Sequence, residues 1–179
     1  MKIRTMVALA AVTGLSAQAK QAEKGTGQRV DVYVYNDLGP LRALPMAEAL
    51  GARMFLSAGV RIEWHYGGQL PAGAIAITLA SRAPASLTPG TMALAFPYER
   101  VHVTLFLDRV LHTNGFVLPP VLLAHVLVHE IAHILQGIDR HSDSGVMKAC
   151  WTAQDYEAMA QKPLPFASED VDLIHRGWR

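Results

Sequence analysis

The sequence predicts a single α+β domain with several short strands and two main helices. In the first two thirds of the chain, short stretches show the period-2 alternation of apolar and polar residues that is typical of strands. A long, almost wholly apolar stretch of helical character follows at residues 119–136. With 179 residues, of which 51% are hydrophobic, the chain has enough apolar material to form one sizeable core and is not expected to be disordered.

The N-terminal segment has the features of a secretory signal peptide. A short basic region is followed by a mainly apolar stretch at residues 6–15 and by the small-x-small cleavage site Ala17-Gln18-Ala19. The apolar stretch is shorter than the about 20 residues that a membrane-spanning helix needs. We therefore predict a signal peptide over residues 1–19, a mature domain over residues 20–179, and secretion to the periplasm or the extracellular space.

The strands of the sheet and its backing helix come next. Alternating or β-rich stretches predict strands at residues 30–35, 60–66, 74–80, 92–96 and 101–107. The short stretch 92–96 is expected at an edge of the sheet. Pro45 begins, and Gly59 follows, a stretch of helical spacing that predicts a helix over residues 45–58.

The second main helix is predicted over residues 119–136, because two prolines begin this stretch and Gly137 follows it. Its polar residues fall on one stripe that covers roughly 140° of the circumference, at about 100° per residue. They are His125, His129, Glu130, His133 and Gln136. Because it would be costly to bury this stripe without partners, we expect it to face a cleft, a metal ion or a polar network.

The C-terminal part of the chain shows two shorter helical stretches. They cover residues 152–160 and 168–176, and Ser168 is predicted to be the N-cap of the second. The only cysteine, Cys150, rules out an intramolecular disulfide and is expected to be a small buried residue.

The polar stripe of the second main helix contains the HExxH motif His129-Glu130-Ile131-Ala132-His133. Histidines four residues apart lie one turn apart on the same face of a helix, so both imidazole rings can reach one metal ion. Zinc suits neutral imidazole ligands and lowers the pKa of its bound water to about 7. Glu130 lies to the side of the histidine pair, where it can act as the general base on that water.

A catalytic zinc site needs a third protein ligand and one open position. His141 and Asp139 lie in the turn after Gly137, and Glu157 lies on the next predicted helix. We favour His141 because a third imidazole suits zinc and the intervening loop is short. Asp139 is the main alternative, and Glu157 is a further one.

Two more residues near the motif have several interpretations. His125, one turn before His129, either lines the cleft, supports a ligand or is held by a local hydrogen bond. Asp143 either orients the ring of His141 or takes part in an ordinary turn.

The stretch HEIAHILQGIDRH, followed by SGVMKA, resembles the metzincin metallopeptidases, whose motif is HExxHxxGxxH with a methionine-containing turn further on. The resemblance implies a zinc endopeptidase with His141 as its third ligand and Met147 in a tight turn beneath the metal. It also implies a mixed twisted sheet with a backing helix and an active-site helix, above a short, irregular C-terminal subdomain that begins at about residue 138.

The spacing here departs from the strict metzincin motif. Gln136 stands where the motif has glycine, and Asp139 stands at the third-ligand position, so the pattern is HExxHxxxGxxxH. An ungapped match selects Asp139, whereas a slightly longer loop delivers His141. Ala149 occupies the position where some members have a tyrosine, which leaves Tyr156 as a candidate for stabilising an oxyanion.

These patterns predict a secreted endopeptidase that binds one zinc ion and cleaves peptide or protein substrates. A net charge of +1 without a basic run gives no reason to expect a nucleic-acid partner, and signal cleavage would leave no membrane anchor. We expect a monomer. Two alternatives are a zinc-binding domain without catalysis and a zinc hydrolase that acts on a non-peptide amide. A purely structural zinc site would need no base at Glu130.

Overall fold

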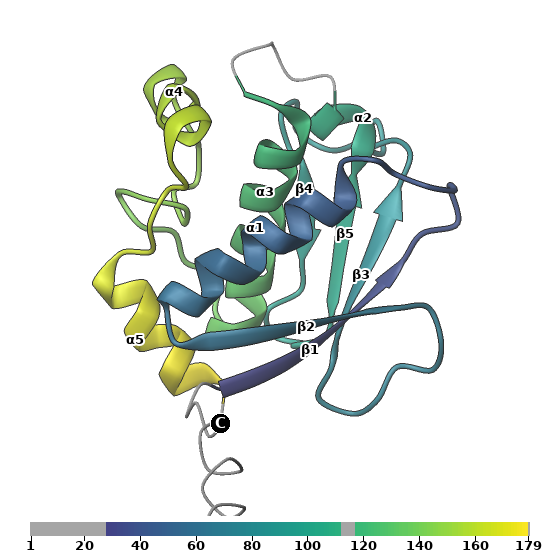
Figure 1. Ribbon diagram of the computed structural model, residues 1–179, viewed down its shortest axis with the longest axis horizontal. Helices are drawn as coiled ribbons and strands as arrows, with labels where there is room; N and C mark the ends of the chain where they lie inside the picture. Colours follow the sequence, from purple (N-terminus) through teal and green to yellow (C-terminus); the bar gives the residue numbers. More distant parts are fainter. Residues whose placement is uncertain (1–27, 112–116, 179) are drawn as a thin grey trace, which may run out of the picture.

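The computed structural model describes residues 28–111 and 117–178, and in this part of the chain α1 and α3 cover one face of a sheet (Figure 1). The predicted signal peptide lies outside the described residues. Within the described ranges, no helix combines the length and the apolar character needed to cross a membrane.

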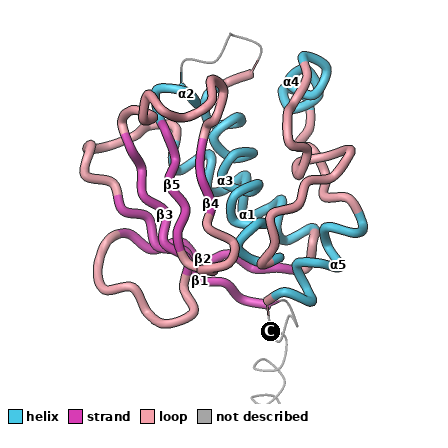
Figure 2. Tube along the Cα trace, turned by 180° about the vertical axis from the view of Figure 1, so that it is seen from behind, coloured by secondary structure: helices cyan, strands magenta, loops and turns pink. Residues whose placement is uncertain are grey.

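The sheet formed by the described residues has five strands in the order β2-β1-β3-β5-β4. They are β1 (Gln28–Tyr35), β2 (Val60–Tyr66), β3 (Ile75–Ala80), β4 (Ala93–Ala95) and β5 (His102–Phe106). The first four in this order pair in parallel, whereas β4 runs antiparallel to β5 and forms one edge (Figure 2). The mixed sheet is therefore confirmed, and so is the short edge strand.

The described residues also form five helices. They are α1 (Leu44–Ser57), α2 (Leu107–Leu111), α3 (Pro119–Gln136), α4 (Ala153–Gln161) and α5 (Ser168–Gly177). Only α2 was not predicted. In this helix the carboxylate of Asp108 accepts a hydrogen bond from Ala83 N–H, and Arg109 donates to the carbonyls of Thr88 and Thr91. These bonds join α2 to backbone groups that are 18 to 25 residues away in the sequence.

The prediction that Ser168 caps α5 is wrong. The N-cap is Ala167, and Ser168 is the first helical residue. The carboxylate of Asp170 accepts a hydrogen bond from Ala167 N–H at 3.1 Å, so a residue inside the first turn satisfies this end of the helix. In α4, by contrast, Thr152 is the N-cap and forms a reciprocal capping box with Asp155.

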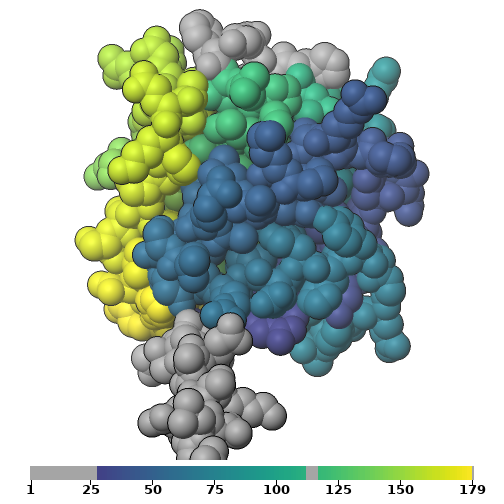
Figure 3. Space-filling view, in the orientation of Figure 1, coloured from purple at the N-terminus to yellow at the C-terminus, as the bar shows by residue number. Residues whose placement is uncertain are grey.

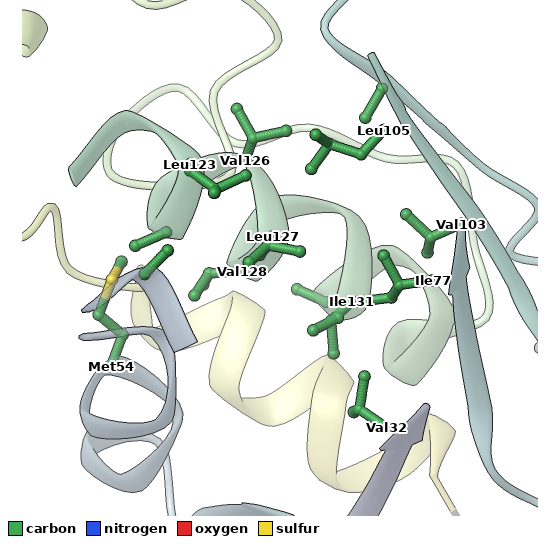
Figure 4. Close-up of a cluster of buried hydrophobic side chains, with 14 of the residues drawn as sticks. Val32, Met54, Ile77, Val103, Leu105, Leu123, Val126, Leu127, Val128 and Ile131 are labelled. Carbon is green, nitrogen blue, oxygen red and sulfur yellow. The ribbon is translucent and has the colours of Figure 1, made fainter. Parts of the chain in front are cut away.

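Helix α3 is the centre of the hydrophobic core. Its apolar side chains point in several directions: Val128 faces Met54 of α1, and Ile131 faces Val32 and Ile77 of the sheet (Figure 4). Burial of each large apolar side chain contributes about 1.5–3 kcal/mol to folding. Because α3 is packed on several sides, the polar stripe on its remaining side is held in a fixed position.

The C-terminal segment packs alongside α1 on the face shown in the space-filling view (Figure 3). Phe166, just before α5, contacts Phe55 of α1 with ring centroids 5.4 Å apart. Near the other end of α5, His175 Nε2 donates to the carbonyl of Ala58 at 2.8 Å. The segment after α3 is thus anchored to the same core that holds α3.

Candidate metal centre

Three imidazole rings meet beside α3. One ring nitrogen from each of His129, His133 and His141 lies within 4.8 Å of the other two. The Nε2 atoms of His129 and His133 are 3.1 Å apart. The ring centroid of His141 lies 5.3 Å from that of His129 and 4.9 Å from that of His133.

The two helical histidines are oriented by hydrogen bonds to backbone carbonyls. His129 Nδ1 donates to Val146 O at 2.9 Å, and His133 Nδ1 donates to Ile138 O at 3.3 Å. With a proton on each Nδ1, both Nε2 atoms carry a lone pair and face each other. A carbonyl partner on the distal ring nitrogen is the usual way in which proteins fix a metal-binding tautomer.

The two Nε2 atoms of His129 and His133 are suited to bind a metal ion and not to share a proton. Burial, together with the nearby charge of His133, lowers the pKa of His129 to about 3, so this ring is neutral at pH 7. Tetrahedral zinc with Zn–N distances of about 2.0–2.1 Å places two ligand nitrogens about 3.3 Å apart. The observed 3.1 Å is close to that value. The donor set and its spacing therefore fit zinc.

The chain turns back toward the two helical histidines after Gly137. This residue has φ +69° and its N–H donates to His133 O at 2.9 Å, which closes α3. A Cβ at this position would lie 2.4 Å from Arg100 Nη2, so the guanidinium would have to move, and the positive φ itself favours glycine. The loop that follows brings the exposed ring of His141 to the helical pair.

The other two candidates for the third ligand do not join the converging ring nitrogens. Asp139 is exposed and lines the same hollow as the histidines, but is not part of the group of converging ligand atoms found among the described residues. Glu157 is exposed on α4 and is not part of that group either. Of the three candidates, the fold thus places His141 with the pair.

Glu130 is partly buried between the histidines and β4. Burial raises its pKa to about 8, and the charge of Asp139 acts in the same direction, whereas a hydrogen bond from the backbone of Ala95 acts against them. A divalent cation held by the neighbouring histidines would lower this pKa again. The carboxylate is therefore sensitive to whatever the histidines bind.

Two hollows meet at the histidines and form a cleft beside β4. Their volumes are about 470 Å³ and about 530 Å³. Phe96 and Tyr98 line the first, and Trp151 and Tyr156 line the second. The residues shared by both are Ala93, His129, Glu130 and His141. Strand β4 thus runs along the cleft past the converging nitrogens.

A tight turn contacts His129, whose Nδ1 donates to Val146 O. Gly145 has φ +76°, and a Cβ there would lie 2.2 Å from Pro165 O. Val146 N–H donates to the same carbonyl oxygen at 2.9 Å, and Ser142 N–H donates to Met147 O at 2.9 Å. Met147 is wholly buried in this turn. Its role as the methionine beneath a metal stays a prediction.

His125 is completely buried and has two hydrogen bonds. Its Nδ1 donates to Val121 O at 2.7 Å, and its Nε2 accepts from Leu164 N–H at 3.0 Å. Of the interpretations considered, the structure supports a locally hydrogen-bonded histidine, which here also joins α3 to the segment before α5.

Asp143 is exposed, and among the described residues no hydrogen bond joins it to His141. The neighbouring Ser142 instead donates to Asp170 Oδ1 at 2.6 Å. This contact could not be predicted from the sequence because its partners are 28 residues apart. No local pattern signals such a pairing.

The prediction that Cys150 is buried is wrong. This residue is exposed and lines the second hollow. The neighbouring Trp151 is half-buried and lines the same hollow, and its ring packs edge-on against His129 with centroids 5.8 Å apart. Tyr156 packs against the same indole ring, at 6.4 Å.

The described residues define a mixed α/β domain with a three-histidine site that could hold a metal ion. The fold is similar to the crystal structure of archaemetzincin from Methanopyrus kandleri, with a TM-score of 0.63 and 12% identity. The match covers 87% of this chain and 98% of the archaemetzincin chain. No family model and no curated protein matches the sequence. At this identity the likeness establishes the fold, and the chemistry has to be argued from the site.

Proposed function

We propose that this protein is a zinc-dependent endopeptidase. The observation that carries the proposal is the convergence of three imidazole nitrogens within 4.8 Å, in a cleft that also contains the Glu130 carboxylate. Two further observations support it: the fold is similar to that of archaemetzincin, and the motif around His129 resembles that of the metzincins.

The residues of the site have separate tasks in this proposal. His129, His133 and His141 would hold one zinc ion, which when bound supplies a Lewis acid to polarise water and a substrate carbonyl. Glu130 accepts a proton from the attacking water and delivers it to the leaving amine nitrogen. Its place beside the histidines and its partial burial suit a group that exchanges a proton within the cleft.

The shape of the cleft supports a peptide as substrate. Strand β4 pairs with β5 on one side, so its other edge has backbone N–H and C=O groups that can align an extended chain. The two hollows meet at the histidines and would offer room for side chains of the substrate on each side of the cleaved bond.

The decisive experiment compares Glu130→Gln with the parent protein. The variant should still bind one zinc ion per chain, measured by elemental analysis, and should lose about 10²–10⁴-fold in the rate of casein cleavage. Glu157→Gln is the matched control, because Glu157 is an exposed carboxylate that lines neither hollow. Its rate should stay close to that of the parent.

Two results would contradict the proposal. Unchanged cleavage by Glu130→Gln would show that this carboxylate is not the base. A parent protein that binds zinc and cleaves no member of a peptide library would favour a non-catalytic zinc-binding domain or a hydrolase of non-peptide amides.

We also propose that residues 1–19 direct export, and that the mature protein acts as a monomer on peptide or protein substrates. N-terminal sequencing of the exported protein should find Lys20 as the first residue, and light scattering should give the mass of one chain. An uncleaved product found in the cytoplasm would contradict the first point.

A further inference from the structure

We propose that Asp170 is a positioning residue for the third metal ligand, His141. This inference depends on the proposed metal-binding function. It concerns a residue of α5 that does not touch the metal site directly, and holds instead the loop from which His141 extends.

The third ligand needs an external anchor because its place in the fold differs from that of the other two. His129 and His133 are buried on a packed helix, and each ring is fixed by a carbonyl oxygen. His141 lies on the loop after α3 and is exposed. Among the described residues, no hydrogen bond reaches its ring, so its position depends on how the adjoining backbone is held.

Both neighbours of His141 are bonded to the same carboxylate. Ser142 Oγ donates to Asp170 Oδ1 at 2.6 Å, and Arg140 Nη1 donates to the same oxygen at 3.3 Å. The second guanidinium nitrogen of Arg140 donates to Glu169 at 2.5 Å. The loop is therefore clamped immediately before and immediately after the ligand.

The Asp170 carboxylate is itself held in place. Its side chain is only 1% exposed, and its other oxygen accepts a hydrogen bond from Ala167 N–H. A buried carboxylate is costly unless its oxygens are satisfied, so Asp170 favours the single loop arrangement that supplies these donors.

The helix that carries Asp170 is fixed relative to α3. Ile174 is completely buried, and Gly177 packs so closely against the end of α3 that a Cβ there would lie 2.4 Å from Leu135 O. The clamp thus connects His141, through α5, to the same helix that carries His129 and His133. This arrangement would keep all three ligands in register.

The test measures zinc affinity rather than catalysis. Asp170→Asn keeps the shape of the side chain but replaces one carboxylate oxygen with an NH₂ group, which cannot accept a hydrogen bond. In one orientation of the amide the NH₂ group faces Ser142 and Arg140, and in the other it faces Ala167 N–H, so at least one hydrogen bond is lost. We expect the zinc dissociation constant, from chelator competition, to rise about 10–100-fold, the usual effect of losing a partner behind a metal ligand. The visible spectrum of the Co²⁺-loaded variant should shift, because ligand geometry has changed.

Asp172→Asn is the matched control, since Asp172 is an exposed carboxylate on the same helix. Ser142→Ala is the second test variant: it removes one bond of the clamp and leaves the Ala167 cap of α5 in place. If Asp170 mattered only as a helix cap, Ser142→Ala would bind zinc as the parent does.

The outcomes separate this inference from the proposed function. Weaker zinc binding by Asp170→Asn and Ser142→Ala, with Asp172→Asn unchanged, supports the positioning role. If the parent binds zinc and Ser142→Ala binds it equally well, the inference is overturned and the proposed function stands. If the parent binds no zinc, both are overturned.

Discussion

The ring of His129 donates a hydrogen bond from Nδ1 to the carbonyl oxygen of Val146 at 2.9 Å. This contact joins α3 to the turn that contains Val146. It also fixes the tautomer of His129 that leaves Nε2 unprotonated. The ability of His129 to bind a metal ion therefore depends on the position of the Val146 carbonyl in the turn. The first prediction tests this dependence.

Gly145→Ala should disrupt the turn and weaken zinc binding. A Cβ at this position would lie 2.2 Å from Pro165 O, a backbone atom that cannot move aside easily. We expect a loss of about 3 kcal/mol or more in the free energy of unfolding, measured by urea denaturation. Gly90→Ala is the control, because Gly90 also has positive φ but has nothing within 4 Å of the added atom. It should cost only about 1–2 kcal/mol. Equal losses in the two variants would contradict the steric argument.

His141→Ala and Asp139→Asn should separate the two principal candidates for the third ligand. Because the ring nitrogens converge without Asp139, His141→Ala should lose most of its zinc affinity and Asp139→Asn should keep it. Zinc content after dialysis against a weak chelator is the measurement. Loss of zinc from Asp139→Asn alone would show that the ungapped motif is the correct one.

The metal-free protein should become less stable as the pH falls below about 6.5. Burial lowers the pKa of His125 in the folded state, so the unfolded chain binds a proton that the folded chain excludes. Stability is therefore full above the unfolded pKa and is lost as the pH falls through it. His129 and His133 contribute in the same direction.

The contribution of His125 can be isolated with His125→Gln, in which the amide can donate and accept as the ring does. The free energy of unfolding is measured with urea, in the presence of a chelator, between pH 7.5 and 5. It should depend on pH less steeply in the variant than in the parent protein, by up to about 1.4 kcal/mol per pH unit. His102→Gln is the control, since the His102 side chain is 56% exposed. An unchanged slope in His125→Gln would contradict the account.

Leu127→Ala should strongly destabilise the domain. This side chain is completely buried in the core around α3, and its removal leaves a cavity that costs about 2–5 kcal/mol. Leu118→Ala, at the start of the same helix, should cost less than about 0.5 kcal/mol because Leu118 is 68% exposed. Thermal denaturation of both variants checks the difference. Similar melting temperatures would mean that α3 is not packed as described.

Much of the fold could be predicted because its elements have strong local patterns. The period-2 stretches became strands, and the prolines and Gly137 marked the ends of α3. Helix α2 could not be predicted from a local pattern, since Asp108 accepts a hydrogen bond from, and Arg109 donates hydrogen bonds to, backbone groups distant in the sequence. The exposure of Cys150 was missed because tertiary packing, and not the local sequence, decides which small residues are covered.

At the candidate site, the spacing of HExxH alone placed His129 and His133 together. The third ligand depends on the path of a loop, and spacing could not choose between Asp139 and His141. The clamp on that loop was beyond local reasoning, because Ser142 and Asp170 meet only after α5 has docked.

The brevity of β4 has a consequence for solubility. An open sheet edge that can receive a substrate strand can equally recruit another molecule of the same protein and seed aggregation. Here the edge is only three residues long, and Pro97 follows shortly after it. So short a ladder offers few backbone groups with which a second copy of the chain could pair.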